Sequence, residues 1–331
     1  MNILFSFLFI LISLLVQILN YEPSDSLFSL LLDKVRKDVV KSSLLNLPER
    51  ENSNLMEMIL LMVKEKINNN LTDIEEAFLI YQWIGENIEI NCANNYVEKE
   101  SMEDIYISGK WSVIGISTLF YMICSIMKIE SGYIDGYTKI HSYGYFKYTE
   151  TQHMWNFILI NNTKYLIDAS LGSGFCTDYS FTKAYTNLYF GIKPEILIKM
   201  NFPKNEEFQM LEKKITKGGW EYLAFRNRYF YLYGLINIEP DNKYLSLKKV
   251  DKVTIKYDTS NSDIGIIAQI YYNDNYGAEL IFNQVTYKGG IAEISLKNWN
   301  KTYYNPIRLE IYAGSKKNPW EKKVVLMNPQ S

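Results

Sequence analysis

The sequence predicts an α+β protein in which a helical and mixed region is followed by an all-β domain. Apolar residues recur at helical spacing through much of the first 127 residues. The segment 153–167 is instead rich in aromatic and β-branched residues, with a turn in its middle, as in a β-hairpin. Beyond Trp220, short strand-like runs alternate with turn residues, which is typical of an antiparallel sandwich.

Three helical stretches are expected before the hairpin. The segment 21–70 is predicted to be helical from Pro23 to about residue 69. Thr72 and Glu75 have the spacing of a capping box and start a second helix, which is predicted to end at Asn87. The third helix is predicted over 112–127. The apolar face of this third helix comprises Val113, Ile116, Leu119, Phe120, Ile123 and Met127. In the first stretch, one apolar face comprises Leu27, Leu30, Leu31 and Val35, and a second comprises Leu55, Ile59, Met62 and Val63.

The strands begin at Gly132–Tyr137 and continue with the hairpin, in which residues 161–164 form the turn. Irregular structure is expected over 91–110 and 175–190. The strands predicted for the second half are Lys252–Tyr257, Ile264–Tyr272, Ala278–Gln284, Gly290–Leu296 and Ile307–Tyr312.

The hairpin carries the candidate site. The chain has two histidines; His153 lies on the first strand, and His141 is expected in an exposed loop. Asp168 follows the returning strand, and antiparallel pairing can bring its carboxylate beside the His153 imidazole. A carboxylate that orients an imidazole is the base half of a nucleophilic site.

Four segments resemble motifs of the transglutaminase-like superfamily, which has a papain-like fold. Gly109–Phe120 resembles the helix that carries that family's nucleophile, and Ile129–Lys139 resembles the strand after it. His153–Asn156 matches the H-x-W-N motif, and Leu166–Ser170 matches L-I-D-x-T/S. The resemblance covers about Leu71 to Gly174. It implies a helix packed on an antiparallel sheet, with His153 and Asp168 as two members of a Cys-His-Asp site.

The nucleophile is missing from this pattern. Gly115, Ser117 and Phe120 fix the register, and the family's cysteine then falls on Val113, which has no nucleophilic atom. Ser112 is the fallback nucleophile, although it is better placed to cap the helix. Cys124 lies eleven residues further on, about 16 Å away at ~1.5 Å per residue, and is expected in the core. The residues expected to line the cleft are Trp111, Trp155 and Asn156.

The region after the site resembles kyphoscoliosis-peptidase-type members of the superfamily. Trp220–Leu223 is similar to the W-Q-L-L that opens their next module. The implied organisation is a transglutaminase-like domain over 71–200 and an immunoglobulin-like β-sandwich over 201–331. Members of that group often lack part of the triad and act as scaffolds or adaptors.

The leading hypothesis is therefore a catalytically inactive transglutaminase-like protein that acts as a binding or scaffold module for a protein partner. One alternative is an active hydrolase or acyltransferase of the same fold with an unorthodox nucleophile such as Ser112. Another is a secreted surface- or carbohydrate-binding protein in which the sandwich presents tyrosines. These are Tyr271, Tyr272, Tyr276, Tyr303 and Tyr304.

Composition bears on partners and location. The net charge of −2 gives no reason to expect nucleic-acid binding. The three cysteines, Cys92, Cys124 and Cys176, have no metal-ligand spacing and no disulfide-framework pattern, and no cofactor or metal is expected. The uncharged apolar run over 1–20 predicts a signal peptide or, alternatively, a single membrane anchor, with membrane contact only if it is not cleaved. A secretory route would expose three sequons, at Asn70, Asn161 and Asn300, to glycosylation.

Overall fold

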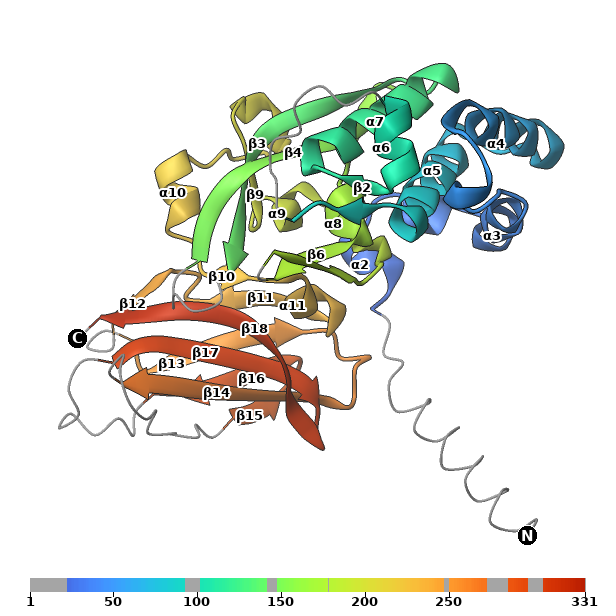
Figure 1. Ribbon diagram of the computed structural model, residues 1–331. Coiled ribbons are helices and arrows are strands. Elements are labelled where there is room, and N and C mark those ends of the chain that lie inside the picture. The colour runs from blue at the N-terminus through green and yellow to red at the C-terminus, as the bar shows by residue number, and fades with distance from the viewer. Residues whose placement is uncertain are drawn as a thin grey trace, which may run out of the picture. The chain divides into compact units, whose positions relative to one another are not determined.

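The computed structural model describes residues 23–92, 102–141, 148–177, 179–246, 250–272, 285–296 and 306–330. They divide into a first unit, Asp25–Glu221, and a second unit from Tyr222 onward (Figure 1). The structure is mixed α+β, with a helical N-terminal region and several antiparallel sheets, in agreement with the predicted class. Residues 1–20, the predicted signal peptide, lie outside the described residues. In the described part of the chain, no helix is long and apolar enough to cross a membrane.

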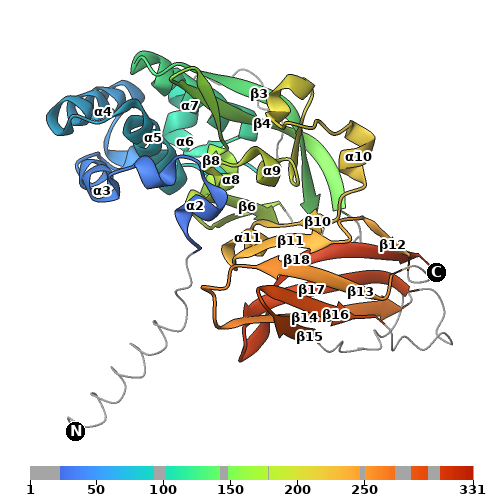
Figure 2. The same ribbon diagram turned by 180° about the vertical axis from the view of Figure 1, so that it is seen from behind.

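The first unit begins with helices and continues into strands. Figures 1 and 2 both show α3 and α4 on the outer side of α5, with α7 on its other side. The helices are α2 (Asp25–Phe28), α3 (Lys37–Leu45), α4 (Leu55–Asn69), α5 (Asp73–Asn87), α6 (Met102–Ser108), α7 (Val113–Ile126), α8 (Ala169–Ser173), α9 (Pro194–Leu197) and α10 (Lys217–Glu221).

Helix α5 forms as its sequence predicts. The Thr72 hydroxyl accepts a hydrogen bond from the Glu75 amide, and the Glu75 carboxylate accepts one from the Thr72 amide, so the capping box is confirmed. Glu75 also accepts two hydrogen bonds from the Arg36 guanidinium, each of 2.6 Å. The capping residue therefore also ties the segment before α3 to the start of α5.

The continuous helical stretch predicted before residue 69 is wrong at its beginning. After α2 the chain forms a turn and a short 3-10 helix, and Leu30, predicted on the apolar face, is exposed. Ser29 explains the interruption. Its hydroxyl donates to the Phe190 carbonyl at 2.7 Å and accepts from the Leu31 and Leu32 amides, so the side chain replaces helical backbone hydrogen bonds. The face predicted for α4 is largely correct, since Leu55, Ile59 and Met62 are buried.

A five-stranded antiparallel sheet lies behind α7, in the order β8-β5-β4-β3-β9. The predicted hairpin is confirmed, with Asn161 and Asn162 at its tip in left-handed backbone conformations that suit a tight two-residue turn. The stretch 175–190, predicted to be irregular, instead contains two paired strands and a 3-10 turn. The strands of the unit are β1 (Glu89–Ile90), β2 (Lys110–Trp111), β3 (Ser131–His141), β4 (Tyr148–Ile160), β5 (Thr163–Ile167), β6 (Gly174–Thr177), β7 (Ser180–Lys183), β8 (Phe190–Ile192) and β9 (Asn201–Pro203).

The first unit extends to Glu221, beyond the domain border predicted at residue 200. Strand β9 is an edge strand of the first sheet, because Thr138 of β3 pairs with Asn201. Trp220 is also buried in this unit, with its ring 5.5 Å from that of Phe202. The motif Trp220–Leu223 therefore spans the border between the two units.

The second unit is built from two sheets, β10-β18-β17-β14 with β12 beside β18, and β11-β13-β16-β15. Predicted strands match β13 and β14 and overlap β16 and β17, whereas 278–284 lies outside the described residues. Strand β18 was not predicted, because its run of charged residues hides the alternation. The elements are β10 (Phe225–Arg226), α11 (Arg228–Leu232), β11 (Leu235–Glu239), β12 (Tyr244–Ser246), β13 (Lys252–Tyr257), β14 (Ile264–Tyr272), β15 (Val285–Lys288), β16 (Ile291–Ser295), β17 (Pro306–Ser315) and β18 (Asn318–Gln330).

The Glu75 carboxylate predicts a pH-dependent contribution to stability. Burial alone would raise the pKa of Glu75, but hydrogen bonds from Arg36 and Thr72 outweigh it and lower the pKa from 4.5 to about 2. A pKa lowered in the folded state stabilises the fold above pH 4.5, and this stabilisation is lost as the pH falls from 4.5 toward 2. Because Arg36 is half exposed, we expect about 1–2 kcal/mol rather than the full shift.

Urea unfolding of a Glu75→Gln variant measures this contribution. The variant should be less stable than the wild type at pH 6, and the difference should shrink progressively below pH 4.5. Glu57→Gln is the matched control, since Glu57 lies in the first turn of α4 and is exposed. A Glu75→Gln penalty that stays constant down to pH 3 would contradict the assignment.

Candidate functional site

The N-terminus of α7 is the position at which the sequence places the missing nucleophile. Ser112 is the N-cap residue, as predicted, and its hydroxyl accepts a hydrogen bond from the Gly115 amide at 3.1 Å. Val113 is the first helical residue and is half-buried. The partial positive charge of a helix N-terminus stabilises a thiolate. A cysteine at this helical position would have its thiolate stabilised in this way, whereas Val113 has no ionisable group.

The three residues predicted to line a cleft are buried in the core instead. Trp111, Trp155 and Asn156 are at most 1% exposed. The Trp111 ring packs on the first turn of α7, where a Cβ on Gly115 would lie 2.8 Å from it. The Asn156 amide donates to the Ser117 carbonyl at 2.9 Å, which fixes α7 against β4. These residues position the helix on the sheet.

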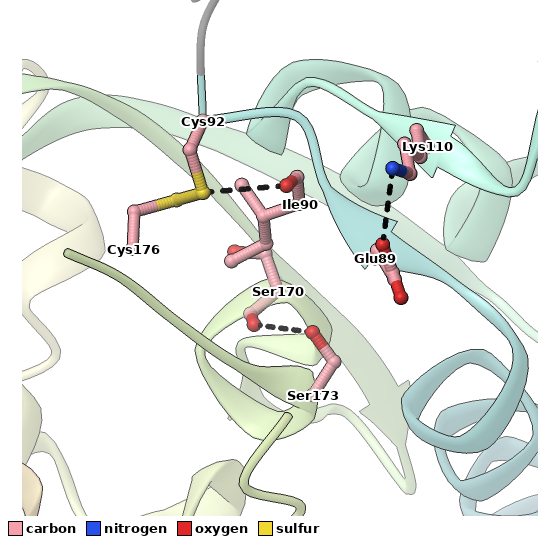
Figure 3. Close-up of a disulfide and its surroundings, with 7 residues drawn as sticks. All are labelled: Glu89, Ile90, Cys92, Lys110, Ser170, Ser173 and Cys176. Carbon is pink, nitrogen blue, oxygen red and sulfur yellow. Dashed lines mark hydrogen bonds and ion pairs between the residues drawn. A yellow bond between two sulfur atoms is a disulfide. The ribbon is translucent and has the colours of Figure 1, made fainter. Parts of the chain in front are cut away.

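None of the three cysteines provides a thiol at this helix end. Cys124 is fully buried, as predicted for a core residue, and burial raises the pKa of its thiol far above the ordinary value. Cys92 and Cys176 form a disulfide with a Cα–Cα distance of 5.6 Å (Figure 3). The sequence predicts no disulfide framework, and it leaves the state of the individual cysteines open. The two cysteines are 84 residues apart, and nothing in their spacing indicates a pair.

His153 and Asp168 are in direct contact, both buried. The Nε2 atom of His153 lies 2.7 Å from Oδ2 of Asp168. His153 projects from β4, opposite Gly136 of β3, and its ring lies beside that of Trp155, with 6.0 Å between centroids. His141, predicted in a loop, is the last residue of β3.

The Asp168 carboxylate accepts four hydrogen bonds. Its Oδ1 atom caps α8, accepting from the Leu171 amide at 2.9 Å and from the Ser170 hydroxyl at 2.8 Å. Its Oδ2 atom accepts from the Asn201 amide at 3.0 Å in addition to His153. Burial would raise the pKa of Asp168, but its interactions with His153, Leu171 and Ser170 outweigh burial and lower it. The carboxylate is thus ionised and can only accept, so the His153 nitrogen facing it carries a hydrogen.

Asn201 and Thr138 complete this arrangement, and both were missed from the sequence. The Asn201 carbonyl oxygen accepts a hydrogen bond from the Thr138 hydroxyl at 2.7 Å, while its amide binds Asp168. We call Thr138, His153, Asp168, Ser170 and Asn201 the Asp168 network. Gly136 lets β9 approach, because a Cβ there would lie 2.3 Å from the Phe202 carbonyl oxygen. That glycine was the one sequence signal of a close strand contact.

These features define the class of the first unit. A helix whose N-terminus takes the nucleophile position, followed by an antiparallel sheet with a His–Asp pair, is the arrangement implied by the sequence motifs. Residues 62–168 match the Transglutaminase-like superfamily. The chain therefore contains a transglutaminase-like superfamily domain.

Curated relatives place this domain near kyphoscoliosis peptidase. The mouse and human proteins of that name are each 25% identical to the chain over 191 residues, which is 56% of the chain and 29% of each relative. Hillarin from Drosophila melanogaster is 22% identical over 231 residues, 64% of the chain and 28% of that protein. The chain thus matches less than a third of the length of these relatives.

Within the described residues, no group of three or more His, Cys, Asp or Glu side chains is placed to hold a metal ion. The described residues provide the His153–Asp168 pair at the site. An imidazole oriented by a carboxylate can accept a proton at its other nitrogen. It requires an adjacent nucleophile to start acyl transfer.

Replacing Asn201 tests the Asp168 network. Asn201→Ala removes one donor from Asp168 and one acceptor from Thr138, and we expect it to lower the free energy of unfolding by about 1–3 kcal/mol. Urea denaturation gives the value directly. Asn205→Ala is the control, because Asn205 is an exposed cap of a short 3-10 turn four residues away. Equal effects of the two substitutions would show that the network contributes nothing beyond an ordinary cap.

Proposed function

We propose that the chain is a catalytically inactive transglutaminase-like protein that acts as a binding or scaffold module. The observation that carries this proposal is Val113 at the first position of α7. None of the other candidate nucleophiles is a free, accessible group at this position: Cys124 is buried, Cys92 and Cys176 form a disulfide, and the Ser112 hydroxyl caps the helix. With no thiol at this end of α7, the His153–Asp168 pair has no cysteine to activate.

A protein is the partner that the surface favours. Helix α4 buries one apolar face and exposes apolar side chains on another, with Met56, Leu60 and Ile67 each more than half exposed. Exposed apolar side chains repeated along a helix are typical of protein contact surfaces. The net charge of −2 gives no support to nucleic acid as a partner.

The second candidate is an acyl-transferring enzyme that uses Ser112. The intact Asp168 network supports it, because an oriented imidazole is retained close to the sheet face on which α7 packs. Against it, the serine hydroxyl accepts the Gly115 amide as a helix cap and is mostly buried. A serine is also a weak nucleophile without an aligned oxyanion hole.

The third candidate is a secreted protein that binds surfaces or carbohydrates through the second unit, and its strand order is compatible with the immunoglobulin-like sandwich proposed from the sequence. Tyr276, Tyr303 and Tyr304 lie outside the described residues, and Tyr271 and Tyr272 are at the end of β14. A glycan array, repeated after these tyrosines are replaced, would separate this function from protein binding.

A single substitution tests whether Val113 occupies a nucleophile position. Wild-type protein should show no amidase or cross-linking activity and no labelling by thiol- or serine-directed probes under native conditions. Val113→Cys should gain a thiol that reacts with iodoacetamide at least several-fold faster than a typical surface cysteine, because the helix N-terminus and His153 favour its thiolate. Mass spectrometry of the alkylated peptide provides the rate.

Ile114→Cys is the matched control, since Ile114 is exposed on the same helical turn and points about 100° away. Reactivity of Val113→Cys that equals this control, or that survives His153→Ala, would mean that the register is wrong. Labelling of Ser112 by a fluorophosphonate in the wild type, lost in His153→Ala, would favour the enzyme instead.

Secretion is a further proposal, supported by the apolar N-terminal run and by the disulfide, since disulfides persist in oxidising compartments. Two predicted glycosylation sites lie in the described residues, and both are exposed: Asn70 after α4 and Asn161 at the hairpin tip. Asn300 lies outside the described residues.

Expression of the full chain in secretory eukaryotic cells should therefore yield protein in the medium that loses mass on treatment with an N-glycosidase. Asn161→Gln should remove one glycan. Asn162→Gln should remove none, because Asn162 is only the middle residue of the sequon and Asn161 and Thr163 are kept. Protein that stays inside the cell without glycan would contradict secretion.

A further inference from the structure

The Cys92–Cys176 disulfide joins the two segments that border the site. Cys92 lies two residues after β1, which pairs with β2 directly before α7. Cys176 lies in β6, which follows α8 without a break, and α8 is capped by Asp168. Figure 3 shows the disulfide beside Ile90 of β1, with Ser170 of α8 lower in the view. The loop that the disulfide closes contains Val113, His153 and Asp168.

The β1–β2 pair that precedes α7 is a short parallel ladder. Each strand has two residues, and the bonds across them include Glu89 amide to Gly109 carbonyl at 2.9 Å and Asn91 amide to Trp111 carbonyl at 2.6 Å. The Glu89–Lys110 ion pair, at 3.6 Å, joins two exposed side chains and contributes little. A pair of such short strands has little stability of its own.

The other end of the disulfide is firmly held. Helix α8 is fixed by the Asp168 network, and Ser170 and Ser173 are both buried and hydrogen-bonded to each other. Strand β6 pairs with β7 along its four residues. The disulfide therefore attaches the short β1–β2 pair to the side of the site that the Asp168 network holds, and Trp111 of β2 leads directly into Ser112 and Val113.

We propose that the Cys92–Cys176 disulfide is a redox-controlled clamp on the N-terminus of α7. In the oxidised protein it keeps β1 and β2 together and Trp111 buried on α7. Its reduction lets β1 and β2 separate, which exposes Trp111 and the surface around Val113. This inference goes beyond the proposed function, because it holds whether or not the site is catalytic.

The disulfide is accessible to the chemistry that this requires. Cys176 is exposed and Cys92 is half-buried. A dithiol attacks one sulfur through a thiolate and is itself oxidised to a disulfide. It gives up two electrons and two protons, and these convert the Cys92–Cys176 bond to two thiols.

Hydrogen exchange of the full chain, oxidised or reduced with dithiothreitol, tests the clamp. Reduction should accelerate amide exchange at least fivefold in residues 88–91 and 109–116, with little change in the sheet residues 131–140 and 153–167. Acrylamide quenching should increase in parallel, and the increase should be absent in Trp111→Phe, which removes the indole that becomes exposed.

The cysteine variants are the controls. The Cys92→Ser/Cys176→Ser double variant should exchange as the reduced protein does and should not respond to dithiothreitol, whereas Cys124→Ser should respond as the wild type does. If the double variant does not fold, the oxidised and reduced wild-type proteins decide.

Three results would overturn the clamp: a disulfide that dithiothreitol cannot reduce under native conditions, unchanged exchange at 109–116, or acceleration spread evenly over the sheet. The last would show that the disulfide only stabilises the whole unit. None of these bears on the probe labelling at Val113→Cys, so failure of the clamp and failure of the proposed inactivity are distinguishable.

Discussion

The first unit depends on the hydrogen bonds that the buried Asp168 carboxylate accepts. It is fully buried and accepts hydrogen bonds from His153 on β4, from Ser170 and the Leu171 amide of α8, and from Asn201 on β9. A buried charge without such partners costs several kcal/mol, roughly 3–5 when one partner of a pair is removed. Displacing the edge strand, the hairpin or α8 therefore leaves this buried charge with fewer partners, which links the stability of the three elements.

The fold depends on His153 and Asp168 but not on the residue at the start of α7. Removing His153 or Asp168 leaves buried polar groups without partners, whereas Val113 takes no part in the Asp168 network. The first residue of α7 can therefore be a valine without breaking a hydrogen bond of the site. The cost of leaving one partner buried and unpaired is therefore enough by itself to keep a His–Asp pair in such a fold. It shows the ancestry of the domain more directly than it shows its chemistry.

Much of the fold follows from local signals in the sequence. The capping box at Thr72, the Ser112 cap and the Asn161–Asn162 turn each need only a few neighbouring residues, and all are found where the sequence predicts them. Long-range partners carry no such signal. Asn201 is 33 residues from Asp168, and nothing local distinguishes its amide from that of any other Asn until β9 pairs with β3. For the same reason the domain border is predicted at residue 200, since β9 is too short to be recognised from the sequence as a strand of the first sheet.

Two long-range links therefore determine how the site is assembled, whereas the residue at the start of α7 is fixed locally. The Asp168 network joins β4, α8 and β9, and the Cys92–Cys176 bond attaches β1–β2 to that frame. Both links are invisible in the sequence, because each depends on residues of common types brought together by folding. The residue at the start of α7 can be recognised from the sequence, because the register of a single helix places Val113 there. The sequence thus shows which residue begins α7, whereas the geometry around that residue follows only from the folded structure.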